Sequence, residues 1–134
     1  MSDTIGDDHK PGHVPGRCRG AQTTAVIRQL RIYEIFERNK GAFHARFREH
    51  AMRIMARHGF AVLRTWETAH DGHTEFAYIL EWPDLATKER AWREFLADPE
   101  WTEIKRVTAA AHGELVGRIE DRVLAETDYS PRRD

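Results

Sequence analysis

Cysteine occurs only once in the 134 residues, as Cys18, so the chain cannot form an internal disulfide. No apolar run is long enough to span a membrane or to form the core of a signal peptide. An excess of one charge is also missing: 21 Lys and Arg side chains against 22 Asp and Glu leave a net charge of -1, and no basic run indicates a nucleic-acid-binding surface. We therefore expect one cytoplasmic globular domain without nucleic-acid or membrane partners.

Several catalytic and cofactor-binding signatures are absent as well. The sequence has no Gly-rich phosphate loop, no Ser-His-Asp arrangement and no HExxH or CxxC motif. Residues 1–24 are rich in Gly, Pro and charge, which predicts a disordered tail, and residues 127–134 predict a second irregular tail. His9, His13 and Cys18 lie in the first tail at a spacing that matches no zinc signature. We predict no metal and no cofactor.

The rest of the chain is organised around a strand followed by a broken helix, residues 74–101. Apolar side chains recur at every second position along residues 74–82, which is the period of a strand. Asp84 and Asp98 each stand where a helix N-cap is expected, and Asp98 is followed by a proline at the first helical position. The apolar positions are Phe76, Tyr78, Leu80 and Trp82 in the strand and Leu85, Trp92, Phe95, Leu96, Trp101 and Ile104 in the broken helix.

Further elements complete the order βαββαβ. Strands are predicted at about residues 26–36, 60–69 and 114–124. A helix is predicted between an Asn39 cap and Gly59. Its inward stripe is expected to comprise Phe43, Phe47, His50, Ile54 and Met55. This order within residues 25–126 predicts an α+β, ferredoxin-like domain with an antiparallel sheet.

The Asp71-Gly72 pair predicts a two-residue hairpin turn between the second and third strands. The turn sets His70 opposite His73 and thereby fixes which side chains share a face. One set pairs Trp66 with Ala77, Arg64 with Ile79, and Val62 with Glu81. The other set pairs Glu67 with Phe76, Thr65 with Tyr78, and Leu63 with Leu80. The second set is the more apolar, so we expect it beneath the helices.

The opposite face of the sheet is expected to mix apolar and charged side chains, namely Gln29, Arg31, Tyr33, Arg64, Trp66, Glu75, Ile79, Glu81, Arg118 and Glu120. A face open to water rarely carries so much apolar surface, and a sealed core rarely carries so many charges. A second copy of the sheet that leaves a polar-lined cavity satisfies both conditions. We predict a homodimer through this face, with a small-molecule ligand in the cavity.

Several stretches resemble the NIPSNAP family. They are QLRIYEI with Leu30, Arg31 and Tyr33; FREHAMRIMARHGF with His50, His58 and Gly59; PDLATKERAW; LADPEW; and LAETDYSP. The resemblance spans about residues 26–131 and implies a dimeric α/β barrel of the ferredoxin-like superfamily. That superfamily includes cofactor-free monooxygenases, isomerases, decarboxylases and haem enzymes, whereas NIPSNAP members mostly lack an assigned reaction. The resemblance therefore predicts the fold further than the function.

Four side chains of the predicted cavity face are candidates for binding a substrate: Arg31, Arg64, Trp66 and Glu75. The two arginines offer a fork of donors to a carboxylate or phenolate. Alternatively they form internal salt bridges with Glu75, Glu81 or Glu120. Trp66 could stack on an aromatic ligand or simply pack against its neighbours.

Three residues are candidates for catalysis: Tyr33, Glu81 and His50. Tyr33 could donate to a developing oxyanion or merely close the cavity. Glu81 lies roughly 20 Å from Glu75 along the strand, which is too far for a paired acid and base, so either would act alone. His50 could serve as a general base or a haem ligand, or it could be a hydrogen-bonded core residue.

These candidates support two functions. The first is an enzyme of secondary metabolism that acts by proton transfer, rearrangement or oxygenation on an anionic or aromatic metabolite. The second is a non-catalytic binding or assembly protein. Open volume with unpaired arginines favours the first, whereas an Arg31–Glu81 or Arg64–Glu75 network that fills the cavity favours the second. A haem enzyme is a third alternative, but the strand faces offer no histidine as an axial ligand.

Overall fold

The computed structural model describes residues 26–131, so the whole predicted N-terminal tail and the last three residues lie outside the described chain. The elements in chain order are β1 (Ile27–Ile35), η2 (Glu37–Asn39), α1 (Lys40–Arg46), η3 (Phe47–Ala51), α2 (Met52–Arg57), β2 (Ala61–His70), β3 (His73–Trp82), α3 (Leu85–Leu96), α4 (Pro99–His112) and β4 (Val116–Ala125). The segments from η2 to α2 form one continuous helical rod, so the predicted βαββαβ order is confirmed.

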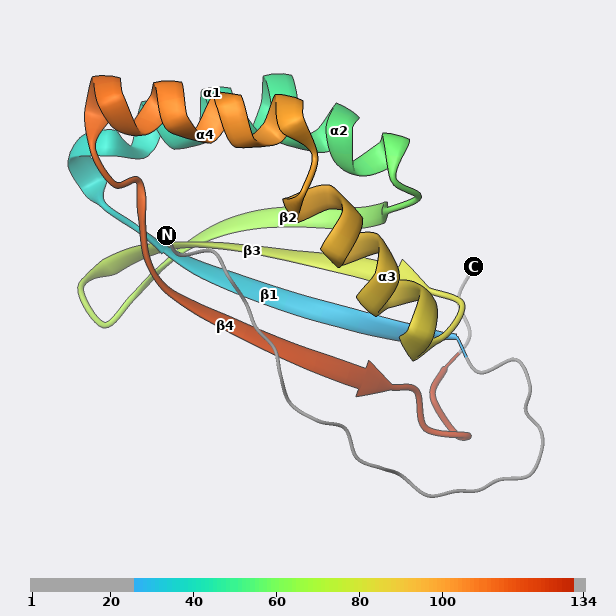
Figure 1. Cartoon of the computed structure of the whole chain (residues 1–134). Helices are drawn as coiled ribbons and strands as arrows, with labels where there is room; N and C mark the ends of the chain where they lie inside the picture. Colours follow the sequence, from blue (N-terminus) through green and yellow to red (C-terminus); the bar gives the residue numbers. More distant parts are fainter. Residues whose placement is uncertain (1–25, 132–134) are drawn as a thin grey trace.

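A single antiparallel sheet forms the base of the domain, with strand order β2-β3-β1-β4. All helices lie on one face of this sheet, and no described element covers the other face (Figure 1). The arrangement is the predicted α+β, ferredoxin-like fold. Among residues 26–131 no helix is long and apolar enough to cross a membrane.

The β2–β3 hairpin turns at Asp71 and Gly72, which both have the positive φ angles (54° and 76°) that a tight turn of this kind requires. The predicted register holds from the turn to the pair Arg64–Ile79. Beyond it the register shifts at Leu63, so Val62 pairs with Leu80 and the predicted pairs of Leu63 with Leu80 and Val62 with Glu81 are wrong. The extra residue of a β-bulge causes this shift.

Two of the three predicted helix caps are confirmed. Asp84 accepts a hydrogen bond from the Thr87 N–H at 2.7 Å, and Asp98 accepts from the first turn of α4. The side chain of Asn39 caps no helix; it donates instead to the carbonyls of His112 and Glu114 at 3.1 and 2.7 Å. Asn39 therefore ties the start of the first helix to the connection between α4 and β4.

A π-helical turn, Phe47–Ala51, interrupts the first helical rod. Its extra residue per turn places Ala51, which is 1% exposed, on the buried stripe in the position predicted for His50. The other predicted members of the stripe are buried, namely Phe43, Phe47, Ile54 and Met55. The prediction that His50 faces inward is therefore wrong.

The side chains of β1 face the two sides of the sheet in the opposite sense to the prediction. Arg31 pairs with Tyr78 and Tyr33 pairs with Phe76, and directly paired residues share a face. Gln29, Arg31 and Tyr33 are consequently buried beneath the helices and do not lie on the uncovered face. The predicted alternation in β1 is confirmed, but its two faces were assigned the wrong way round. Polarity was a misleading guide, because these buried polar groups hydrogen-bond to one another.

Candidate functional site

Arg31 is the centre of a buried polar network between the sheet and the helices. Its NH1 group donates to Asp121 at 2.7 Å, and its NH2 and Nε groups donate to the hydroxyls of Tyr33 and Tyr78 at 3.0 and 3.3 Å. The two hydroxyls share a hydrogen bond of 2.6 Å, and the guanidinium lies 4.2 Å from the ring centre of Trp92. Burial alone would lower the pKa of Arg31, but the neighbouring Tyr33, Tyr78 and Asp121 outweigh it and hold that pKa well above its usual value.

Gln29 closes the network on the other side of Asp121. Its side-chain nitrogen donates to both carboxylate oxygens of Asp121, at 3.1 and 3.0 Å. Its side-chain oxygen accepts from the indole N–H groups of Trp82 and Trp92, at 2.9 and 2.8 Å. The cavity beside Arg31 measures only about 30 Å³. Such a space accommodates a water molecule, so this network resembles a satisfied polar core more than a metabolite site.

The remaining predicted binding residues lie on the uncovered face of the sheet, together with Glu81. Glu81 accepts a hydrogen bond from Arg28 at 2.9 Å, and Trp66 is 48% exposed. Among the described residues neither an Arg31–Glu81 nor an Arg64–Glu75 ion pair is formed. The structure therefore separates the predicted site residues onto the two faces of the sheet.

His50 lies away from both groups. It lines a groove between η3 and α4 on the outer side of the helices, and its Nδ1 is 3.0 Å from the NH2 group of Arg53. The same Arg53 nitrogen donates to Glu100 at 2.7 Å. His50 is thus part of a surface chain of charged groups. Its role in catalysis stays a prediction, because it lies away from the other predicted site residues.

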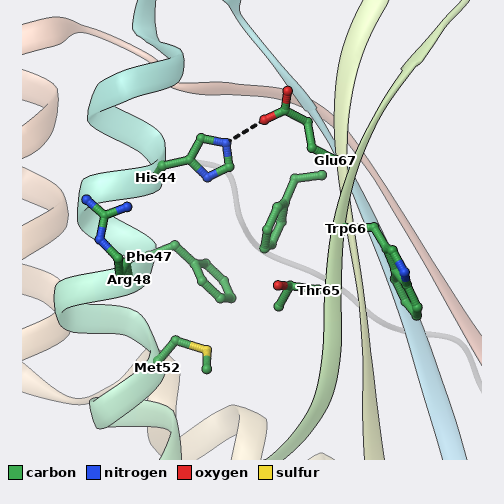
Figure 2. Close-up of a pocket in the computed structure, with 8 residues that line it drawn as sticks. His44, Phe47, Arg48, Met52, Thr65, Trp66 and Glu67 are labelled. Atoms are coloured by element: carbon green, nitrogen blue, oxygen red, sulfur yellow. Dashed lines mark hydrogen bonds and ion pairs between the residues drawn. The ribbon is translucent and has the colours of Figure 1, made fainter.

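A cleft of about 370 Å³ opens between the first helical rod and the edge strand β2. This volume lies within the range of small-molecule sites. The residues that line it are His44, Phe47, Arg48, Met52, Thr65, Trp66, Glu67 and Phe76. Figure 2 shows His44, Phe47 and Met52 reaching from the helix toward the strand, with Thr65 opposite them, while the Trp66 ring projects to the far side of the sheet. Trp66 therefore lines the cleft without presenting its indole to it.

The polar end of the cleft is an ion-pair cluster at its rim. His44 Nε2 lies 2.8 Å from Glu67 Oε1, and Lys40 Nζ lies 3.3 Å from Glu67 Oε2. The hydrogen bonds from His44 and Lys40 hold the pKa of the Glu67 carboxyl below its usual value. Glu67 is therefore an anion at neutral pH, with each carboxylate oxygen assigned to a different partner.

The walls of the cleft are aromatic. The Phe47 and Phe76 rings meet edge to face with centroids 4.8 Å apart, and the His44 ring meets Phe76 in the same way at 5.9 Å. Met52, which is 38% exposed, adds a flexible thioether that adapts to different shapes. Phe47 and Arg48 belong to the π-helical turn, a feature that is frequent at functional sites.

Sequence reasoning missed His44, Met52, Thr65 and Glu67, although one signal pointed to two of them. The hairpin register placed Thr65 and Glu67 on the face assigned to the helices, opposite Tyr78 and Phe76, as the structure confirms. Two polar side chains on the inner face of a strand indicate a gap in the helical cover. The other two residues gave no separate signal, because their helix positions read as ordinary surface.

Among the described residues no group of three or more His, Cys, Asp or Glu side chains is arranged to hold a metal ion. His9, His13 and Cys18 lie outside the described residues.

Comparisons with known proteins identify the family. The NIPSNAP family model matches residues 28–131. A NIPSNAP-like domain protein from Burkholderia xenovorans aligns with a TM-score of 0.68 at 21% identity, over 82% of this chain and 92% of that one. A NIPSNAP family protein, Atu5224 from Agrobacterium tumefaciens, gives 0.68 at 20% identity, over 81% and 99%.

A more distant likeness extends to an enzyme. A monooxygenase from the gene ActVA-Orf6 of Streptomyces coelicolor, in complex with nanaomycin D, aligns with a TM-score of 0.50 at 12% identity, over 82% of this chain and 95% of that one. At this identity only the fold is shared. No curated protein matches the chain. Because the NIPSNAP family model covers nearly all of the described residues, the chain belongs to the NIPSNAP family.

Proposed function

We propose that this chain binds a small, mainly apolar molecule that carries a ring, in the cleft between η3 and β2. The observation that carries the proposal is the cleft itself, about 370 Å³ in volume, with two phenylalanine rings as walls and a His44–Glu67 pair at one end. The monooxygenase of similar fold that holds nanaomycin D gives the proposal a precedent in fold.

The chemistry of the cleft selects the kind of ligand. The edges of Phe47 and Phe76 favour a planar ring, and Met52 accommodates variation in its outline. The polar groups are confined to the rim, where His44 and Glu67 meet. A ligand with an apolar body and one polar substituent matches this distribution.

A thermal-shift experiment with one filling variant and one matched control tests the site. Met52→Trp fills the cleft from an exposed position, and Val107→Trp adds the same bulk at an exposed position of α4, in the groove beside His50. The probes are 2-naphthol and 2-naphthoate. We expect both to raise the melting temperature of the wild type and of Val107→Trp by mass action, but not that of Met52→Trp.

Two results would contradict the cleft proposal. A shift that is lost only in Val107→Trp would locate the ligand in the groove between η3 and α4. A shift that survives unchanged in both variants, or that is absent from the wild type, would show that the cleft is not a ring-binding site.

The uncovered face of the sheet favours a second candidate function, assembly of two copies. Trp66 and Leu124 on this face are 48% and 40% exposed, and Leu30, Ile32 and Ile79 lie between them on the inner strands. So many apolar side chains on one uncovered sheet face are unusual on a monomer. Charged side chains of both signs surround it, namely Arg28, Arg64, Arg122, Glu75, Glu81 and Glu120. A self-complementary surface of this kind suits a two-fold homodimer.

Sedimentation tests the assembly. We expect the wild type to sediment as a dimer at micromolar concentration, and Ile79→Glu to sediment as a folded monomer, because burying a carboxylate between the two copies costs free energy. Leu85→Glu is the matched control, since Leu85 is exposed on α3, away from the uncovered face. A wild-type monomer, or a dimer that survives Ile79→Glu, would contradict the proposal.

A further inference from the structure

The tautomer of a neutral His44 follows from its partner. Glu67 is a carboxylate and can only accept hydrogen bonds, so the Nε2 atom of His44 that lies 2.8 Å from it must carry a proton. A neutral imidazole then has a free electron pair on Nδ1. No described residue hydrogen-bonds to Nδ1, and this nitrogen is on the side of the ring that faces Phe47 and the interior of the cleft (Figure 2).

The charged groups around His44 come from β2 and from its own helical rod. Glu67 from β2 is the one in direct contact, and Lys40 on α1 holds the second oxygen of the same carboxylate. Glu37 pairs with Lys40 at 3.5 Å and partly offsets its charge. Arg48, one turn along the helix, is largely exposed and pairs with Glu49 at 3.6 Å. A carboxylate held by two partners therefore lies in contact with Nε2 of His44, while Nδ1 has no partner among the described residues.

We propose that the cleft takes weakly acidic hydroxyl compounds, phenols or enols, and that His44 accepts their proton. This inference rests on the proposed function, since it needs a ring in the cleft. The hydroxyl O–H bond breaks, an N–H bond forms at Nδ1, and the electron pair stays on the ligand oxygen as a phenolate or enolate. Thr65, whose side chain extends into the cleft, offers a hydroxyl donor to that oxygen (Figure 2). Glu67 is a positioning residue that holds the ring and stabilises the imidazolium.

The probe pair 4-nitrophenol and 4-nitroanisole separates binding from proton transfer. The first has an acidic hydroxyl and a phenolate with its own visible absorption band, whereas the second is its methyl ether and has no proton to give. At about one pH unit below its pKa, about one tenth of free 4-nitrophenol is ionised. We expect the bound probe to be mostly ionised at that pH, so that the phenolate band grows several-fold on addition of the protein.

Three variants identify the acceptor. His44→Gln should abolish the growth of the band even at 4-nitrophenol concentrations that saturate the cleft, while 4-nitroanisole still raises the melting temperature. Glu67→Gln keeps an acceptor for Nε2 but removes the charge, so it should reduce the ionised fraction of 4-nitrophenol measured at saturating probe. His70→Gln, at the exposed tip of the β2–β3 hairpin, is the control and should behave as the wild type.

The outcomes distinguish the two proposals. Binding of both probes without a phenolate band, or a band that persists in His44→Gln, would overturn the inference and leave the binding function standing. Failure of both probes to bind would overturn the inference and the proposed function together. Loss of both probes from Met52→Trp, with the band present in the wild type, would support both.

Discussion

His58 and His44 each share a short hydrogen bond with a carboxylate, yet the two pairs stand in different surroundings. The Nε2 atom of His58 lies 2.7 Å from Asp98, and that of His44 lies 2.8 Å from Glu67. The Asp98 side chain is only 8% exposed and also accepts from Arg57 and from two backbone N–H groups of α4. The Glu67 side chain is 42% exposed at the mouth of a cleft.

The difference shows that the length of a hydrogen bond does not indicate its role. Every donor around Asp98 belongs to a junction that joins the end of α2 to the start of α4, so the pair fixes two helices relative to each other. Around Glu67 the donors lie on one side, and the free nitrogen of His44 faces open volume. The first pair suits a structural role and the second suits chemistry, and four predictions test this contrast.

The largest loss of stability is expected where a carboxylate pairs with a fully buried charge. Asp121→Ala leaves the guanidinium of Arg31, whose side chain is 4% exposed, without its carboxylate. We expect a loss of about 3 kcal/mol in the free energy of unfolding, at the lower end for a broken buried pair because Asp121 itself reaches solvent. Urea denaturation measures it.

Arg122→Ala is the matched control for that change, since it breaks the neighbouring exposed Arg122–Glu120 pair of 2.9 Å. It should cost less than about 1 kcal/mol. Equal losses in the two variants would show that Arg31 does not depend on Asp121.

A smaller loss is expected at the helix junction. Asp98→Ala removes the N-cap of α4 and leaves Arg57 and His58 without their acceptor, which should destabilise the fold by about 2 kcal/mol. Asp98→Asn keeps a capping oxygen and should cost less than half as much. The difference between the two urea midpoints separates the cap from the charge, and identical midpoints would remove the cap from the explanation.

The same junction should make stability depend on pH. Hydrogen bonds from His58, Arg57 and the first turn of α4 hold the pKa of Asp98 far below its usual value. A carboxyl whose pKa is depressed by folding stabilises the protein above its unfolded pKa, about 3.9, and this contribution is lost as the pH falls further. We therefore expect the wild type to lose more stability between pH 6 and pH 3 than Asp98→Asn. Parallel losses in the two proteins would contradict this assignment.

Much of the fold was predictable because local signals were strong. Alternation in β3, the Asp71-Gly72 turn and the caps at Asp84 and Asp98 each follow from local chemistry, and the structure confirms them. The bulge at Leu63 and the π-helical turn were not predictable. Each inserts one residue into a strand or a helix, and the apolar pattern on either side of the insertion still has the normal period.

The candidate site was predictable only in part. Arg31 and Tyr33 looked like cavity residues because buried charges are rare, and no local pattern revealed that Asp121, ninety positions away, would pair with Arg31. His44 and Glu67 meet through the packing of a helix on an edge strand, which also leaves no local trace. The sequence could place Glu67 on the inner face of the sheet, but only the fold shows that this face is open there.

The smallest loss of stability is expected at the cleft, for the His44–Glu67 pair. Glu67→Ala removes the acceptor of His44 and Lys40, but all three side chains contact solvent, so the free energy of unfolding should fall by less than about 1 kcal/mol. Urea denaturation of Glu67→Ala beside Asp98→Ala measures the difference directly. A loss as large as that of Asp98→Ala would make the pair a structural tie between α1 and β2, and a histidine needed for that tie is poorly placed to exchange protons with a ligand. A negligible loss would show that the short hydrogen bond contributes little to stability. A role of the His44–Glu67 pair in the adjacent cleft would then be favoured over a structural role.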